Sequence, residues 1–308
     1  MELSVLIPVF NQDLSALAGM LREAIAQAGV ETEILLMDDA SEPQWQEKNA
    51  RLASGETLQY IQLARNVGRA AVRNRLATEA RGEWLLFLDG DMELSGPEFI
   101  QKYWEQRKAP LVIGGHRYGA KPEEPELQFH WCYGSRVESK GAALRQKNPY
   151  RSFMTGNFLI RRELFLSIRF DESIAGYGHE DTLFGLEAMK RQVPVLHIDN
   201  PAIHRGLMPL ETFLQKNRQA VHNLLQIYLK EEALRPHLLR SSGLLTAFER
   251  LRSSGLLRGF DLWARWRAGS WSRKLEKGCS GAALMHFSML KLHCLVRNYR
   301  ALKSKEKR

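Results

Sequence analysis

The sequence lacks the features that mark several large classes of protein. Only three cysteines occur among 308 residues, Cys132, Cys279 and Cys294, and they are too few and too scattered for a disulfide framework or a zinc site. We expect reduced thiols in a reducing compartment. No run approaches the 18 apolar residues of a membrane span, and the N-terminus has no signal-peptide pattern. These absences predict a cytoplasmic protein.

Two common phosphate-binding motifs are also missing. The P-loop pattern G-x-x-x-x-G-K-[ST] does not occur anywhere in the chain. No G-x-G-x-x-G follows the first predicted strand, which argues against a dinucleotide site of the Rossmann type. A nucleotide site in this chain must therefore be built in another way.

The net charge of +9 is unevenly placed along the chain. Residues 235–308 carry 17 Lys and Arg against 4 Asp and Glu, whereas the rest carries 27 against 31. The basic character therefore belongs to the C-terminal quarter, and the main body is slightly acidic. This distribution disfavours nucleic acid as a partner of the main body.

Short apolar runs alternate with segments of helical spacing up to residue 115. We predict strands at 3–9, 33–37, 58–63, 84–88 and 111–115, and helices at 14–28, 45–53, 68–80 and 99–107. This alternation is typical of right-handed βαβ units and a mostly parallel sheet. Beyond it we expect a long binding loop at 116–149, strands at 158–160 and 195–198, a helix at 183–190, and a helical chain from Thr212 onward.

Polar residues follow most of these strands, at the sheet edge where ligands of open α/β sheets bind. They are Asn11, Asp38, Asp39, Asn66, Asp89 and Asp91. Gly90 lets the backbone turn so that both flanking carboxylates can face one site. Mg²⁺ takes one or two carboxylates and completes its shell with phosphates and water, so the pair suits a metal-bound diphosphate. The alternative is a strand-end turn or a helix cap.

Several motifs, in order, resemble family 2 glycosyltransferases of the GT-A fold over residues 1–210. They are the strand ending in Pro-Val-Phe-Asn, ILLMDDAS at 34–41, NVGRAAVRN at 66–74, FLDGD at 87–91, FMTGNFLIRRE at 153–163 and GYGHEDTLFG at 176–185. The resemblance implies a Rossmann-like GT-A catalytic domain at 1–210, followed by a basic helical extension at 211–308. It also implies a nucleotide-sugar donor, Mn²⁺ or Mg²⁺, and inversion at the anomeric carbon.

The resemblance also implies roles for individual residues. Nucleotide-sugar binding is expected of Pro8, Val9, Asn11, Asp39, Asn66, Gly68, Arg69, Arg73, Asn74, Asp89, Gly156 and Asn157. Asp39 is expected to bind the base, typically uracil, and the metal ligands are expected to be Asp91, Asp89 and His204. A histidine ligand favours Mn²⁺ over Mg²⁺. Val72 departs from the family's Ala-Arg-Asn, and the alternative reading of Arg69 and Arg73 is an exposed basic surface.

Glu180 and Asp181 form a second carboxylate pair, between glycines and ahead of a predicted helix. An acceptor hydroxyl must lose its proton as it attacks the anomeric carbon, and a carboxylate within hydrogen-bond reach can take it. By resemblance we assign Asp181 as the catalytic base and expect Glu180 to bind a sugar. The alternative is that Asp181 only caps the helix.

Trp263, Trp266 and Trp271 lie among lysines and arginines of the basic extension. This pattern favours peripheral association with the inner face of an anionic membrane, and the alternative is a helical cap with buried tryptophans. In the 116–149 segment, Trp131 and Tyr133 are candidates for stacking on an acceptor sugar.

The sequence thus predicts a metal-dependent, inverting glycosyltransferase. It would move a sugar from a nucleotide sugar, a UDP-sugar in our prediction, to a hydroxyl of a glycan or lipid-linked acceptor during synthesis of a surface polysaccharide or lipopolysaccharide. One alternative is a retaining glycosyltransferase or nucleotidyltransferase on the same sheet edge. The other is a non-catalytic protein that binds nucleotide sugars.

Overall fold

A computed structural model describes residues 1–53, 57–174 and 176–305 of the chain. The chain divides into two compact units. The first, here called the sheet unit, comprises Met1–Gly119, Val137–Ala175 and Glu180–Gly206. The second, here called the helical unit, comprises Ala120–Arg136, Gly176–His179 and Leu207–Arg308.

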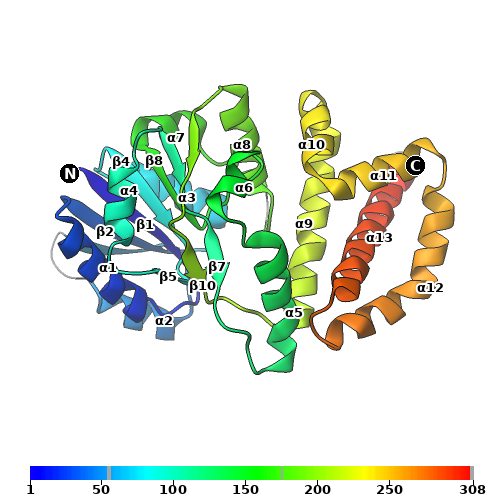
Figure 1. Cartoon of the computed structure of the whole chain (residues 1–308), viewed down its shortest axis with the longest axis horizontal. Coiled ribbons are helices and arrows are strands. Elements are labelled where there is room, and N and C mark those ends of the chain that lie inside the picture. The colour runs from blue at the N-terminus through cyan, green and yellow to red at the C-terminus, as the bar shows by residue number, and fades with distance from the viewer. Residues whose placement is uncertain (54–56, 175, 306–308) are drawn as a thin grey trace. The chain divides into compact units, whose positions relative to one another are not determined.

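The sheet unit is built on a seven-stranded sheet in the order β3-β2-β1-β4-β8-β6-β9. Figure 1 labels β1, β2, β4 and β8 of this sheet. The strands are β1 (Leu3–Val9), β2 (Thr32–Asp38), β3 (Leu58–Gln62), β4 (Trp84–Leu88), β6 (Leu111–Ile113), β8 (Asn157–Arg161) and β9 (Val195–His197). Only β8 runs antiparallel to its neighbours, and the other described pairs are parallel. The α/β prediction with a mostly parallel sheet is therefore confirmed.

Helices cover both faces of this sheet because its strands are apolar on both sides. Val5 and Ile7 of β1 pack in the cluster that includes α1 (Ser15–Ala28) and α4 (Phe99–Glu105). Leu6, between them, packs in the opposite cluster with α3 (Arg69–Glu79), α7 (Arg162–Ile168) and α8 (Glu180–Lys190). Helix α2 (Pro43–Ala50) lies between β2 and β3 in the chain.

A second, three-stranded sheet in this unit has the order β5-β10-β7. Its strands are β5 (Met92–Glu93), β10 (Ala202–His204) and β7 (His116–Tyr118). β5 begins one residue after Asp91, and β10 pairs with it antiparallel, so that His204 lies opposite Met92. The small sheet therefore brings a distant histidine to the end of β4.

The prediction of a long loop at residues 116–149 was wrong. This segment contains β7, α5 (Pro125–Tyr133), a π-helical turn at Gly134–Glu138 and α6 (Ala142–Gln146). Pro125 at the first turn of α5 suits a helix start, and Phe129 and Cys132 are buried. Glycine, proline and charged residues around these short helices hid the pattern in the sequence.

The helical unit confirms the prediction of helices after Thr212. It contains α5, α9 (Leu210–Lys230), a 3₁₀ turn at Glu232–Leu234, α10 (Arg235–Ser241), α11 (Gly243–Ser253), α12 (Leu257–Glu276) and α13 (Gly281–Lys305). Phe129 of α5, Phe213 of α9 and Phe287 of α13 share a buried aromatic cluster. Among the described helices none has a stretch both long and apolar enough to span a bilayer.

A disulfide bond joins Cys132 of α5 to Cys279, between α12 and α13. The expectation of reduced thiols was therefore wrong for two of the three cysteines. Cys294 is unbonded. The two bonded residues are 147 positions apart, and only the folding of α5 into the helical unit brings them together, which the spacing of cysteines in the sequence does not reveal.

Candidate active site

The ends of β1 and β2 form the first part of the candidate site. The carboxylate of Asp39 accepts hydrogen bonds from the backbone N–H groups of Val67 (2.6 Å) and Gly68 (2.9 Å). Gly68 has φ +89°, a conformation that glycine adopts without strain, and it precedes the first residue of α3. Asp39 thus fixes the start of the helix that carries both candidate arginines.

Asn11 forms two hydrogen bonds at this end of the sheet. It has φ 49°, and its side-chain oxygen accepts from the backbone N–H of Glu42 at 2.8 Å. Its own N–H donates to Ser41 Oγ at 2.8 Å. The preceding Pro8 is half-buried and Val9 is buried. Asn11 therefore connects the β1 end to the segment after β2.

Asp38 and Asn66 also make internal bonds at this edge. Asp38 accepts from Tyr60 Oη at 2.8 Å and from the N–H of Ser41 at 2.6 Å. Asn66 donates its side-chain amide to the carbonyl of Asp39 at 3.1 Å. The strand-end polar residues therefore meet, as expected for parallel strands.

The Asp-Gly-Asp turn after β4 forms the second part. Asp89 donates its N–H to the carbonyl of Gly156 at 3.1 Å, and its own carbonyl accepts from Met92 at 3.1 Å. A Cβ on Gly156 would lie 3.2 Å from Asp89 Oδ2 and only 2.7 Å from Met92 Cε. The absence of a side chain at Gly156 therefore leaves room beside the Asp89 carboxylate.

Arg73 holds Asp89 from the first turns of α3. Its Nη2 donates to Asp89 Oδ1 at 2.5 Å, and the arginine side chain is only 1% exposed. Its Nη1 lies 3.8 Å from Glu180 Oε1. Arg69, one helical turn earlier, lies 3.7 Å from the same oxygen. Arg73 therefore connects the carboxylate at the β4 end to the carboxylate at the start of α8, and Arg69 adds a second cation beside the latter.

Asp91 and His204 form a close pair. The imidazole Nε2 lies 3.3 Å from Asp91 Oδ2, and Arg205 donates its N–H to the Asp91 carbonyl at 2.8 Å. Burial opposes charge on both groups. The contact with His204 nevertheless holds the pKa of Asp91 below its usual value, and the contact with Asp91 raises the pKa of His204. Each group thus favours the charged form of the other.

The residues around this pair fit a divalent ion in part. Asp91 Oδ1 is buried and, among the described residues, has no hydrogen-bond partner. Carboxylate oxygen and imidazole nitrogen are suitable ligands for Mn²⁺. Within the described chain, no cluster of three or more His, Cys, Asp or Glu side chains is arranged to hold a metal. An ion here would therefore need oxygens from its substrate.

Glycine at position 206 is required by this arrangement. A Cβ on Gly206 would lie 2.1 Å from Asp91 Oδ2, closer than atoms can approach. The sequence motifs gave no indication of Gly206 or of the residues beside His204. Tyr118 packs 5.1 Å from the His204 ring, between centroids, and donates its hydroxyl to Glu138 at 2.6 Å. β7 has only three residues, so its sequence carried no signal.

Asp181 lies in the first turn of α8, next to Glu180. Its Oδ1 accepts from the N–H of Thr182 at 2.6 Å. Burial and the neighbouring charge of Glu180 raise the pKa of Asp181 to about 7, although Thr182 and Arg69 act in the opposite direction. A carboxyl group with this pKa is half-protonated near neutral pH and can accept a proton from a hydroxyl.

Two of the predicted binding residues use their side chains for hydrogen bonds within the sheet unit. Asn74 bonds to the backbone of Phe170 through both its amide oxygen and its amide nitrogen. Asn157 accepts from Tyr103 Oη at 2.7 Å and donates to the carbonyls of Gly115 and Asn200. Both side chains are buried, and their expected contacts with a donor stay predictions.

This chain is similar to known proteins both in sequence and in structure. Dolichol-phosphate mannosyltransferase of Pyrococcus furiosus is 29% identical over 175 residues, which cover 53% of this chain and 47% of that protein. The chain thus spans about half the length of this relative.

Two solved structures are similar in fold. TarS 1–349 of S. aureus in complex with UDP has a TM-score of 0.53 at 19% identity, covering 100% of this chain and 91% of that one. The mannosyltransferase PcManGT of Pyrobaculum calidifontis, in complex with GDP-Man and Mn²⁺, has a TM-score of 0.56 at 15% identity, covering 97% and 87%. The sheet, its helices and these likenesses define a GT-A fold.

The sequence pattern of glycosyl transferase family 2 matches residues 4–169, more than half of the chain. This chain belongs to glycosyl transferase family 2. The resemblance found in the motifs is therefore confirmed at the level of family and fold.

Proposed function

We propose that this protein is an inverting glycosyltransferase that transfers a sugar from a nucleotide-sugar donor to a hydroxyl acceptor. The observation that carries the proposal is Asp181, a carboxyl group of raised pKa at the start of α8. Its neighbour Glu180 is connected through Arg73 to Asp89 at the end of β4. A base and a diphosphate-binding edge thus belong to one network of side chains.

The donor's nucleotide would bind at the ends of β1 and β2. Pro8, Val9, Asn11 and Asp39 are the candidate contacts, and Asp39 keeps acceptor capacity beyond its two backbone bonds, since a carboxylate can accept about four. Uracil offers a ring N–H to such an acceptor, which supports a UDP-sugar. Asn66, Gly68, Arg69 and Gly156 complete the proposed donor site.

Asp91 and His204 would supply ligands to Mn²⁺ or Mg²⁺, Asp89 is the third candidate, and phosphate oxygens of the donor would complete the shell. As a metal ligand, His204 would bind in its neutral form. When bound, such an ion supplies Lewis-acid stabilisation to the leaving diphosphate. Arg69 and Arg73 place two further cations around Glu180 and Asp89, where they would orient the donor's phosphates and sugar.

Asp181 would act on the acceptor. As the acceptor oxygen forms its bond to the anomeric carbon, the bond from that carbon to the diphosphate oxygen breaks. The hydroxyl proton passes to an oxygen of Asp181, and the nucleoside diphosphate leaves with the bonding electron pair. The half-buried position of Asp181 keeps its proton affinity high enough for this transfer.

A glycan or lipid-linked acceptor is our proposal for the second substrate, in synthesis of a surface polysaccharide or lipopolysaccharide. The name dolichol-phosphate mannosyltransferase, carried by the Pyrococcus furiosus relative, supports a lipid-linked acceptor. Trp263 and Trp266 are 46% and 77% exposed on α12, among the cations of the helical unit. This combination supports peripheral binding to an anionic membrane from the cytoplasmic side.

A screen of nucleotide sugars tests the proposal. The full chain would be mixed with UDP- and GDP-sugars, with and without Mn²⁺, and both its thermal stability and the release of nucleoside diphosphate would be followed. We expect one donor class to raise the melting temperature and to be slowly hydrolysed only with the metal. If no nucleotide sugar changes the melting temperature, the donor site proposed here is wrong.

A further inference from the structure

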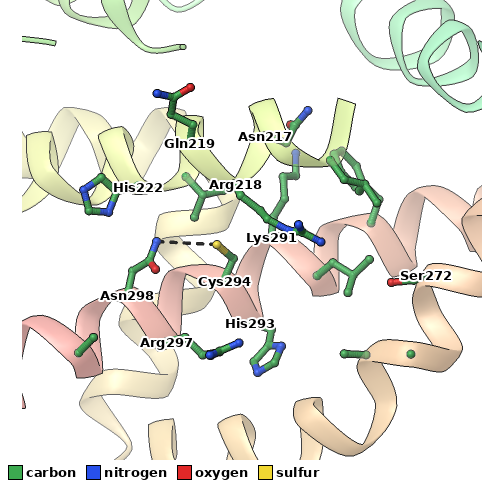
Figure 2. Close-up of a pocket in the computed structure, with 17 residues that line it drawn as sticks. Asn217, Arg218, Gln219, His222, Ser272, Lys291, His293, Cys294, Arg297 and Asn298 are labelled. Carbon is green, nitrogen blue, oxygen red and sulfur yellow. Dashed lines mark hydrogen bonds between the residues drawn. The ribbon is translucent and has the colours of Figure 1, made fainter. Parts of the chain in front are cut away.

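The helical unit contains a cavity of about 750 Å³ that the proposed transfer does not use. Figure 2 shows the side chains of α9, α12 and α13 that line it. Every residue of its lining belongs to the helical unit. Its volume lies within the range of cavities that hold small ligands, which is roughly 300–1,000 Å³.

The cavity exists because α12 presents small residues to it. Ala268, Gly269 and Ser272 form the α12 wall, and a Cβ added to Gly269 would meet no atom within 4 Å. Opposite them, residues of α9 and α13 recur at intervals of three and four, so each of these helices turns one face to the space. The small side chains leave open the volume that larger ones would fill.

The lining combines an apolar floor with cationic walls. The apolar part includes Leu214 and Val221 of α9 and Phe287 of α13, all of which are buried. Arg218, Lys291 and Arg297 supply positive charge, and His222 and His293 also line the space. Among the described residues that form this lining, none is Asp or Glu.

Two of the cations come from different helices. Arg218 reaches from α9 toward α13, whereas Arg297 belongs to α13 (Figure 2). Arg218 Nη1 also lies 3.7 Å from Oε1 of Glu211, an exposed residue two helical turns earlier on α9. The positive charges of the lining repel one another in this partly buried space. An anion that entered the cavity would reduce that repulsion.

We propose that this cavity binds an amphiphile with a phosphate head group and a hydrocarbon chain. The guanidinium groups of Arg218 and Arg297 match phosphate oxygens in geometry and charge. Three cations suit a phosphomonoester, which carries between one and two negative charges at neutral pH, better than a single carboxylate. The chain would lie along Leu214, Val221 and Phe287. The site is independent of the proposed transfer reaction.

Titration calorimetry with dodecyl phosphate, below the concentration at which it forms micelles, tests the proposal on the full chain. Inorganic phosphate and dodecanoate serve as comparison ligands. We expect dodecyl phosphate to bind at least about tenfold more tightly than either, because inorganic phosphate lacks the hydrocarbon chain and dodecanoate offers the three cations only a singly charged carboxylate. Absence of binding, or equal binding of either comparison ligand, overturns the proposal.

Two double variants of equal charge locate the site. Arg218→Ala with Arg297→Ala removes two lining cations, whereas Arg258→Ala with Arg273→Ala removes two exposed cations of α12 that do not line the cavity. We expect the first pair to weaken dodecyl phosphate binding by about tenfold or more, and the second to leave it nearly unchanged. Equal losses in the two pairs would mean a general surface effect and would overturn the assignment.

Filling the cavity provides an independent check. Gly269→Phe places a ring in the open space and should weaken binding as strongly as the loss of the two arginines. Circular dichroism and nucleotide affinity establish that the variant is folded, and if it is not, the arginine pair decides. Undiminished binding to a folded Gly269→Phe variant would show that the ligand lies elsewhere.

Discussion

The two units differ in where their carboxylates lie relative to the cations of the candidate sites. At the edge of the main sheet, cations are matched by carboxylates, as in Arg73 with Asp89, Arg69 with Glu180 and His204 with Asp91. In the helical unit, none of the described residues that line the cavity is Asp or Glu, and the carboxylates of Glu211 and Asp261 contact Arg218 and His293, respectively, from outside the lining. We therefore expect an anion at the sheet edge to need an additional cation, whereas the anion proposed for the cavity would need none.

This difference has a physical basis in the elements that form each unit. Parallel strands bring their carboxyl ends to one edge, so the short polar residues that end the strands accumulate there. Asp89 and Asp91 would repel a diphosphate, and a divalent ion would turn that repulsion into attraction. Helices carry long cationic side chains along one face, and these reach into a space between helices without help from a metal.

The largest expected effect concerns the base in the sheet unit. Asp181→Asn keeps the size of the side chain but removes its proton affinity, so we expect transfer to fall by about 10²–10⁴-fold. Nucleotide affinity, measured by calorimetry, should change little. Glu79→Gln, an exposed carboxylate on α3, is the control and should retain activity. Normal turnover by Asp181→Asn would remove the inverting mechanism and favour a retaining one.

The next effect separates the stability of the two units. Removing the disulfide by Cys132→Ala with Cys279→Ala should lower the free energy of unfolding of the helical unit by about 2–5 kcal/mol, since the bond closes a long segment of chain. Urea unfolding monitored by circular dichroism measures the loss. Cys294→Ala, which removes the unbonded thiol, is the control. UDP affinity should be unaffected, and equal stability with and without the bond would contradict the prediction.

A smaller effect is the pH dependence that Asp181 gives to the sheet unit. Its folded pKa of about 7 lies above the ordinary value of 3.8, so the folded state binds more protons than the unfolded state between these values. Stability should therefore fall as pH rises from about 4 to 7, by roughly 1–3 kcal/mol. In the same range kcat/KM should rise with pH, because the base must be ionised.

Thermal unfolding of wild type and Asp181→Asn at a series of pH values checks whether stability falls as pH rises. The variant lacks the ionisable group, so it should be the more stable protein at pH 8 and about equal to wild type at pH 4. The opposite order at pH 8 would mean that the carboxylate of Asp181 is stabilised by its surroundings.

The smallest expected effect concerns the membrane surface proposed for the helical unit. Trp266→Ala removes the most exposed large apolar side chain of α12, and we expect binding to anionic vesicles to weaken by about tenfold. Sedimentation with vesicles of anionic lipid and with vesicles of neutral lipid measures the fraction of protein bound. Met285→Ala, which is 58% exposed on α13, is the matched control. Equal binding to neutral vesicles would rule out the contribution of the basic residues.

Much of the sheet unit was predictable from its sequence. The strands at 3–9 and 84–88 have the bounds that their apolar runs indicated, because a strand buried on both faces must be apolar throughout. The positions of Asp39, Asp89 and Asp181 at strand and helix ends followed from the same pattern. Their contacts did not, because a hydrogen bond between Asp39 and Gly68 depends on how two βα units pack.

The helical unit was less predictable. Its helices were expected, but α5 was not, because its composition resembles that of a loop. Trp271 is buried, whereas Trp263 and Trp266 are exposed, although all three belong to one helix. The sequence does not reveal which face of a mixed helix meets its neighbours, because that depends on the packing of α9, α12 and α13.

The sequence by itself determined the family, the order of the elements and the residues that end the strands, since these depend on local periodicity and short motifs. Tertiary structure alone decided the pairing of His204 with Asp91, the bond between Cys132 and Cys279, and the cavity beside Gly269. Each of these joins parts of the chain that lie far apart. Such contacts form only when distant segments pack together, and no local pattern of residues records them.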